Sequence, residues 1–137
     1  MAKPYPLEII TPERQFYKGD VEAVVIDTPD GKRGVLANHT PMIIALNVGE
    51  VDIKTDGKWK QCFSSEGFME ILPDKVLIMA QVVEWPEEID ARRAQEAKDR
   101  AEERLRQKQS LREYHATMSS LARAMARLRI KSSMNID

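Results

Sequence analysis

Up to residue 83, apolar and polar side chains alternate in short runs, and each run is bounded by residues that favour turns. Alternation with a period of two places one face of a strand on a core and the other toward solvent. The runs that predict strands are 7–9, 21–26, 42–48, 51–53, 59–64, 68–72 and 76–83. We expect about eight to ten short strands in an antiparallel sandwich or barrel, in an order that the pattern leaves open.

Turn chemistry separates these runs at three clear positions. The segment 29–31 reads Pro-Asp-Gly, in which proline presets its own φ angle and glycine accepts a positive one. Asp56 and Gly57 stand between two apolar runs and predict a tight hairpin. The segment 73–75, Pro-Asp-Lys, predicts a third turn.

The pattern changes after Pro86, beyond which the chain contains neither proline nor glycine. Small apolar residues recur at spacings of three and four from about residue 90 to residue 108 and predict a first helix. Ser110 and Glu113 then form a capping-box pattern that predicts the start of a second helix. The second helix carries a heptad seam of Leu111, Tyr114, Met118, Leu121, Met125 and Leu128. Two helices with a short link predict an antiparallel hairpin.

This hairpin has little apolar surface of its own to bury. The stripe of its first helix consists of Ala94, Ala97, Ala101 and Leu105. Such a stripe offsets the ordering entropy by only a small margin, so the hairpin needs the β domain, a ligand or a partner. A segment of this kind can exchange between docked and undocked forms. We predict an α+β chain with a β domain over residues 1–85 and a regulatory helical hairpin over residues 86–137.

The formal net charge of −1 hides an asymmetry between these two parts. Residues 1–84 contain 9 basic and 13 acidic residues, whereas residues 87–131 contain 12 basic and 8 acidic residues. This suggests two kinds of partner, or one half folding against the other. Aromatic residues are not interleaved with the basic ones, which disfavours nucleic acid. No run approaches the roughly 18 apolar residues of a membrane span, and residues 1–5 show no apolar signal region, so we expect a cytoplasmic location.

Few residues point to catalysis. The two histidines, His39 and His115, are far apart, and neither has a cysteine or carboxylate at metal-ligand spacing. The single cysteine, Cys62, cannot form an internal disulfide and is predicted to fill space in a buried strand. The motifs of nucleophile elbows, P-loops and dinucleotide-binding loops are missing. We therefore predict no catalytic residue, no metal site and no enzymatic activity of the chain by itself.

Four arginines of the hairpin form a candidate binding site. Arg123 and Arg127 stand four residues apart, and Arg93 and Arg100 stand seven apart, so each pair projects from one helical face. Four guanidinium groups that converge would suit a polyphosphate, because arginine presents fixed forks to phosphate oxygens. The spacing is also compatible with a solvated charged face, and Asp90 is compatible with a simple N-cap of the first helix.

Four segments carry a resemblance to a known family over nearly the whole chain. They are 21–28 leading to a glycine turn, 34–41 (GVLANHTP), 67–76 (GFMEILPDKV), and 89–94 (IDARRA) followed by helices rich in alanine and arginine. In this order, they resemble the epsilon subunit of bacterial F-type rotary ATP synthases, the counterpart of the mitochondrial delta subunit. The resemblance implies an N-terminal β sandwich and a C-terminal helix hairpin.

The resemblance also implies a non-catalytic rotor subunit of a proton- or sodium-translocating complex, on the cytoplasmic face of the membrane. In the family, the sandwich grips the gamma subunit of the central stalk and touches the membrane ring of c subunits. The helices fold on the sandwich or extend among the catalytic beta and alpha subunits and block ATP hydrolysis. The segment that resembles the ring-facing one is Asp30, Gly31, Lys32 and Arg33. Residues expected to meet the catalytic subunits are Arg123, Arg127, Arg129 and Lys131.

In members of the family that bind ATP, the ligand holds the hairpin in its folded form. The positions that match this site are Glu84, Ile89, Asp90, Arg93, Ala94, Arg100, Arg123 and Arg127. ATP is thus expected as a regulatory ligand, and no cofactor is required. The alternative function is a free-standing nucleotide-sensing protein outside any complex.

Two loops depart from the family's pattern. The usual Gly-His-Ala-Pro is Asn-His-Thr-Pro at 38–41, where asparagine tolerates the left-handed backbone conformation. Glu66 stands where a second glycine commonly precedes Gly67.

Overall fold

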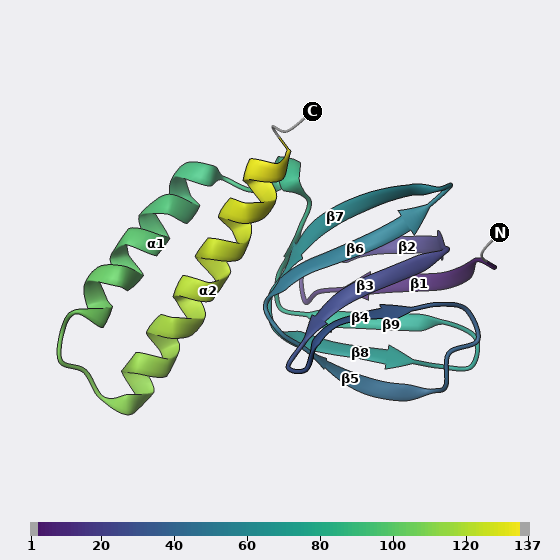
Figure 1. The fold of residues 1–137 in the computed structure, drawn as a ribbon, viewed down its shortest axis with the longest axis horizontal. Helices are drawn as coiled ribbons and strands as arrows, with labels where there is room; N and C mark the ends of the chain where they lie inside the picture. The colour runs from purple at the N-terminus through teal and green to yellow at the C-terminus, as the bar shows by residue number, and fades with distance from the viewer. Residues whose placement is uncertain (1–2, 135–137) are drawn as a thin grey trace.

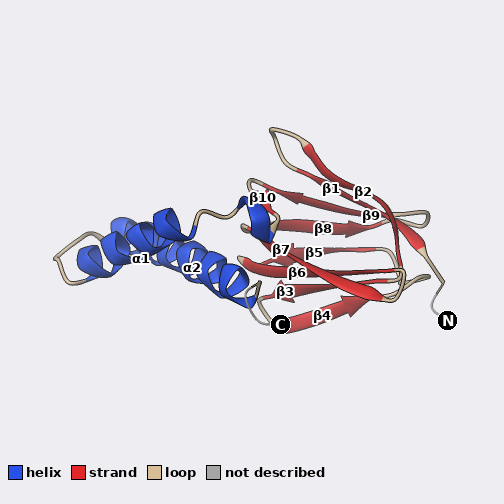
Figure 2. Cartoon of the chain, turned by 90° about the horizontal axis from the view of Figure 1, so that it is seen from above, coloured by secondary structure: helices blue, strands red, loops and turns tan. Residues whose placement is uncertain are grey.

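The computed structural model describes residues 3–134 and shows a β sandwich followed by two helices (Figure 1). Within this range, ten strands form two five-stranded sheets that lie as two layers (Figure 2). The first sheet has the order β2 (Gln15–Val21), β1 (Tyr5–Ile10), β9 (Val76–Ala80), β8 (Gly67–Ile71), β5 (Met42–Leu46). The second sheet has the order β10 (Val83–Glu84), β7 (Lys58–Ser64), β6 (Gly49–Thr55), β3 (Ala23–Thr28), β4 (Gly31–Val35). The predicted sandwich is confirmed.

One pair of strands departs from the predicted antiparallel arrangement. β1 runs parallel to β9, with Leu7 opposite Val76 and Ile9 opposite Ile78. Parallel neighbours need a long connection, and here all strands from β2 to β8 lie between them in the chain. The first sheet is therefore completed by a strand from the end of the domain.

Two apolar runs that predicted single strands each divide between the two sheets. Val21 ends β2 in the first sheet, and β3 begins at Ala23 in the second, so the chain turns a corner at Glu22. The run 76–83 divides likewise, with β9 in the first sheet and β10 in the second. Apart from Glu22 and Gln81, both runs are apolar, because residues on either side of the corner face the same core.

The segment 31–34, which was not among the predicted strands, is a strand in the structure. Only Pro29 and Asp30 form the turn, and Gly31 begins strand β4, which pairs with β3. Gly31 has a φ angle of 114°, which suits glycine at this position. The hairpin at Asp56 and Gly57 is confirmed, with φ angles of 50° and 74°. Asn38 takes the expected left-handed conformation, with a φ angle of 63°.

Large apolar side chains from both sheets fill the space between them. Leu7, Ile26, Ile53 and Ile78 are at most 1% exposed. Cys62 is completely buried in the same core, as predicted, and burial raises the pKa of its thiol to about 12. The sandwich thus has an apolar core of its own.

A short 3-10 helix, η1 (Pro86–Glu88), leads from the sandwich into α1 (Ala91–Leu105) and α2 (Leu111–Ser133). Asp90 is the N-cap of α1 and accepts a hydrogen bond from the backbone N–H of Arg93 at 3.1 Å. Ser110 and Glu113 form the predicted capping box of α2. α2 lies against β6 and β7, and α1 packs on the other side of α2 (Figure 1). None of the helices in residues 3–134 is both long and apolar enough to cross a membrane.

The predicted heptad seam of α2 is covered only in part. Leu111, Tyr114, Met118 and Met125 are 39–73% exposed, whereas Leu121 and Leu128 are half-buried. The buried residues of α2 are instead Thr117, Ala124, Ala126 and Ile130, and those of α1 are Ala94 and Ala101. The fully buried positions of the two helices are thus mostly small residues, and four of the six seam residues remain exposed.

Candidate functional site

A pocket of about 210 Å³ lies where the hairpin meets the last strand of the sandwich. Its lining comes from β10, η1, both helices and the N-cap of α1. The residues that line it are Glu84, Glu88, Asp90, Arg93, Ala94, Ala97, Arg100 and Arg127. Six of the eight residues predicted for an ATP site are among them, and only Ile89 and Arg123 are not.

Two helices and one strand bring the pocket's charges together. Arg93 and Arg100 come from α1, Arg127 comes from α2, and Glu84 comes from β10. Asp90 is fixed by its capping bond, which the sequence left open as the simpler explanation of this residue. Its side chain both caps α1 and lines the pocket. The predicted convergence of arginines therefore holds for three of the four.

Arg127 is held firmly against the sandwich. Its Nε donates a hydrogen bond to Glu84 Oε1 at 2.7 Å, and both side chains are 26% exposed. Its guanidinium carbon lies 4.4 Å from the centre of the Phe63 ring, which is a cation–π distance. This ion pair joins α2 to β10 across the pocket. A bound polyphosphate would compete with Glu84 for the same guanidinium group.

Ile89 and Arg123, the two predicted site residues outside the lining, lie nearby. Ile89 is 3% exposed and packs in a small apolar cluster with Phe63, Ala126 and Ile130. Arg123 lies one turn before Arg127 and pairs with Glu66, at 3.7 Å between Arg123 Nη1 and Glu66 Oε1. Ile89 thus fastens the start of the hairpin to the sandwich.

Sequence reasoning missed Glu88 and Ala97 of the lining, and it missed Arg14, which lies outside the lining and binds Glu88. Glu88 Oε1 accepts hydrogen bonds from Arg14 Nη2 at 2.8 Å and from the Trp85 backbone N–H at 2.9 Å. These bonds, led by the one from Arg14, hold the pKa of the Glu88 carboxyl below its usual value. Arg14 Nη2 also donates to the Val83 carbonyl oxygen at 3.2 Å. The acidic run beside Pro86 could have suggested Glu88, but no local signal marks Arg14, which is 74 residues away.

The residues predicted to contact the catalytic subunits are engaged by the sandwich in this form. Arg129 Nε lies 3.7 Å from Glu50 Oε1, and Lys131 Nζ donates a hydrogen bond to the Pro86 carbonyl oxygen at 3.0 Å. With the pairs of Arg123 and Arg127, α2 therefore places a row of cations on acidic residues of the sandwich.

The segment predicted to face the ring lies at the same end of the sandwich. Lys32 Nζ lies 3.0 Å from Asp27 Oδ1 and 3.6 Å from Glu50 Oε2, so Glu50 stands between Lys32 and Arg129. Arg33 Nη2 lies 3.2 Å from Met42 Sδ. Asp30 and Gly31 form the exposed tip.

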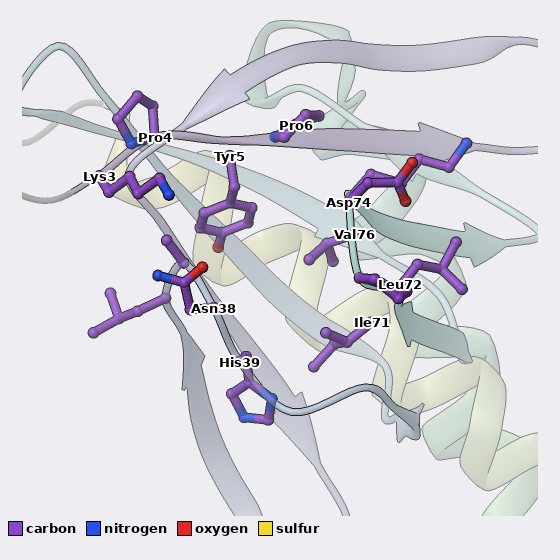
Figure 3. Close-up of a pocket in the computed structure, with 14 residues that line it drawn as sticks. Lys3, Pro4, Tyr5, Pro6, Asn38, His39, Ile71, Leu72, Asp74 and Val76 are labelled. Atoms are coloured by element: carbon purple, nitrogen blue, oxygen red, sulfur yellow. The ribbon is translucent and has the colours of Figure 1, made fainter.

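A second pocket, of about 170 Å³, lies where β1 begins and β4 ends (Figure 3). Tyr5 lies in its wall and donates a hydrogen bond from its hydroxyl to the Val35 carbonyl oxygen. His39 Nδ1 lies 2.8 Å from the Thr40 carbonyl oxygen, which is a local contact within the same loop. None of the predicted site residues lines this pocket. Within residues 3–134, no group of three or more histidine, cysteine or acidic side chains could hold a metal ion.

Two family models match consecutive parts of the chain. Residues 5–86 match the β-sandwich domain of the ATP synthase delta/epsilon chain, and residues 87–132 match its long α-helix domain. The chain belongs to this family. Among its relatives is the ATP synthase epsilon chain of Caldanaerobacter subterraneus subsp. tengcongensis, which is 50% identical over 133 residues, 96% of each chain. The predicted family and the predicted role as a non-catalytic subunit of ATP synthase are confirmed.

Solved structures show the same fold. A chain of the Euglena gracilis mitochondrial ATP synthase (OSCP/F1/c-ring) matches with a TM-score of 0.71 and 22% identity over 96% of this chain and 79% of that one. A chain of the Tetrahymena thermophila mitochondrial ATP synthase central stalk and c-ring has a TM-score of 0.71 and 12% identity, over 95% of this chain and 98% of that one. Both likenesses concern the fold.

Proposed function

We propose that this epsilon chain is a rotor subunit whose hairpin restrains ATP hydrolysis and is gated by ATP. The sandwich couples the central stalk to the membrane ring on the cytoplasmic face. The hairpin exchanges between the docked form described above and an extended form that meets the catalytic beta and alpha subunits. Family membership disfavours the alternative of a free-standing nucleotide sensor.

The observation that carries the proposal is the pocket lined by Arg93, Arg100 and Arg127. These residues come from two helices, and the pocket is closed by Glu84 of the sandwich, so the complete lining exists only while the hairpin is docked. A ligand that binds only this form shifts the population toward it by its differential affinity. A polyphosphate is the proposed ligand because the three guanidinium groups of the lining can present forks to phosphate oxygens.

The apolar seam of α2 supports an extended form. In the docked hairpin four of its six large side chains are exposed, with Leu111 at 73% and Met125 at 43%. A heptad seam is suited to packing on another helix, and the docked hairpin covers only part of it. The cations of α2 that pair with the sandwich would meet acidic surfaces of the catalytic subunits after release.

The first sheet offers a surface for the gamma subunit. Ile43, Phe68 and Met79 lie on the neighbouring strands β5, β8 and β9 and are 69%, 55% and 41% exposed. Phe68 stands opposite Met79 on one side and opposite Ala45 on the other, and Ile43 lies two residues from Ala45 on β5. Because side chains two residues apart point to the same face of a strand, Ile43, Phe68 and Met79 share one face of the sheet. Contiguous exposed apolar residues of this kind indicate a protein interface. Asp30, Gly31, Lys32 and Arg33 are the proposed contact with the ring of c subunits.

Calorimetric titration of the full chain with ATP tests the gating. We expect the wild type to bind ATP and the Arg123→Ala/Arg127→Ala variant to lose binding, because the variant lacks both guanidinium groups of α2. The matched control is Arg92→Ala/Arg106→Ala, which removes two cations whose ion pairs lie within α1 and its C-cap and should bind as the wild type does. Lack of binding by the wild type up to millimolar ATP would overturn the gating and leave the coupling role standing.

A further inference from the structure

Arg123 is held away from the nucleotide pocket by a contact of its own. Its neighbour one turn later, Arg127, lines the pocket, whereas Arg123 does not. Arg123 Nη1 lies 3.7 Å from Glu66 Oε1, and Nη2 donates a hydrogen bond to Ser120 Oγ at 3.3 Å. Arg123 is one-third exposed, so its side chain has room to reorient.

Glu66 is placed to act on Arg123 alone. It lies in the two-residue link between β7 and β8, and its side chain is 53% exposed. Its one ion pair in the described residues is with Arg123. The backbone of the link is held independently, since Ser65 N–H donates to the Val82 carbonyl oxygen at 2.9 Å. Replacing the Glu66 side chain should therefore leave the sandwich intact.

We propose that Glu66 is a built-in competitor of the nucleotide's phosphates for Arg123. A carboxylate and a phosphate present similar oxygen pairs to a guanidinium group, and the orientation in which Arg123 meets Glu66 leaves it outside the pocket lining. Without nucleotide, the Glu66 pair helps to hold α2 on the sandwich. With nucleotide, the pair must break before Arg123 can reach the phosphates. Glu66 thus sets how far docking depends on ATP, an inference that rests on the proposed nucleotide site.

Competition has a signature that simple loss of a structural contact lacks. In Glu66→Gln, the docked form loses the pair. The docking constant, which is the ratio of docked to undocked hairpins without ATP, should therefore fall. The intrinsic dissociation constant of ATP for the docked form should fall by the same factor, because no pair remains to be broken. For an exposed ion pair this factor is roughly 1.5- to 5-fold. The ratio of the docking constant to the dissociation constant should remain that of the wild type.

Two measurements on the full chain supply these constants. Docking is followed by energy transfer between dyes on Lys58→Cys, at the far end of β7, and Gln107→Cys, in the link between the helices. Cys62 is completely buried and does not compete for the labels. ATP affinity is measured by calorimetry on the unlabelled chain, and the docked fraction converts the apparent constant into the intrinsic one.

Controls separate charge competition from other effects. Glu102→Gln removes an exposed carboxylate of α1 that forms no ion pair within residues 3–134 and should change neither constant. Glu66→Asp keeps the charge and should lie nearer to the wild type than Glu66→Gln does. Salt screens exposed pairs, so wild type and Glu66→Gln should converge in about 1 M salt.

The outcomes divide cleanly. If Glu66→Gln docks less and binds ATP more tightly, the competition is supported. If it docks less and its intrinsic affinity for ATP is unchanged or weaker, Glu66 is a structural contact and the inference is wrong. If neither constant changes while the wild type binds ATP, the inference is also wrong, but the nucleotide site stands. If the wild type binds no ATP, the proposed gating itself fails.

Discussion

The sandwich and the hairpin are held together by different means. The sandwich buries large side chains from both sheets, such as Ile26 and Ile53, which are inaccessible to solvent. The hairpin reaches it through Phe63, Ile89, Ala126 and Ile130 and through a few ion pairs at least a fifth exposed. Exposed ion pairs contribute only about 0–1 kcal/mol each. One region is therefore stable in itself, whereas the other is attached weakly enough for the exchange that we propose.

The largest effect should come from the sandwich core. Replacing Ile53, which is completely buried, with alanine leaves a cavity between the sheets and should lower the free energy of unfolding by about 2–5 kcal/mol. Urea denaturation measures this, with Ile43→Ala as control. Ile43 is 69% exposed, and its loss should cost about 0.5 kcal/mol or less. Equal losses in the two variants would contradict the assignment of the core.

The next effect should separate docking from folding. Ala126→Glu places a carboxylate in the buried contact of α2 with the sandwich, where it cannot be solvated while the hairpin is docked. We expect at least a ten-fold loss of ATP affinity, stronger inhibition of ATP hydrolysis in the assembled complex, and an unchanged urea midpoint of the sandwich.

Met125→Glu is the matched control for this variant on the same helix. Met125 is 43% exposed in the docked hairpin, so ATP affinity should stay near that of the wild type. Met125 belongs to the exposed part of the heptad seam, which we propose packs on the catalytic subunits in the extended form. A carboxylate at this position should therefore weaken inhibition of ATP hydrolysis. Loss of ATP binding by Met125→Glu as well would mean that the seam contributes to docking and that the comparison of the two faces is wrong.

The smallest effect concerns the linker between the two regions. Arg14 holds the pKa of Glu88 below its ordinary value of 4.5, so this pair stabilises the folded state above that pH and loses its effect as the pH falls through the lowered value. Glu88→Gln should lower stability near neutral pH by no more than about 1 kcal/mol and approach the wild type in acid. Urea midpoints between about pH 3 and pH 7 measure this, with the exposed neighbour in Glu87→Gln as control. A constant difference across this range would exclude the ion pair as its cause.

Local patterns predicted most of the elements. The Asp56 hairpin, the Asp90 cap and the Ser110 capping box depend on residues a few positions apart, and all three are present in the structure. The division of apolar runs at Glu22 and after Ala80 was not predictable, because a corner between sheets keeps the same side chains in one core. The heptad seam of α2 did not predict which side chains are buried in the hairpin, because an apolar stripe does not show on which surface it packs.

Site residues could be predicted where their spacing along one helix places them on one face. They could not be predicted where the tertiary fold brings distant segments together. Arg93 and Arg100 could be placed on one face of α1 from their spacing alone. The whole set of eight residues needed the family resemblance. The contacts of Arg14 with Glu88 and of Glu66 with Arg123 join distant parts of the chain, and no local pattern announces them.

The parallel pairing of β1 with β9 bears on how the chain matures during synthesis. The first strand to leave the ribosome must wait for residues 76–80 before its own sheet can close, and such distant pairing slows folding. Translation reaches the hairpin only afterwards. All strands of the sandwich have been synthesised by residue 84, so the basic α2 is made last, after every strand that carries the acidic surface on which it docks.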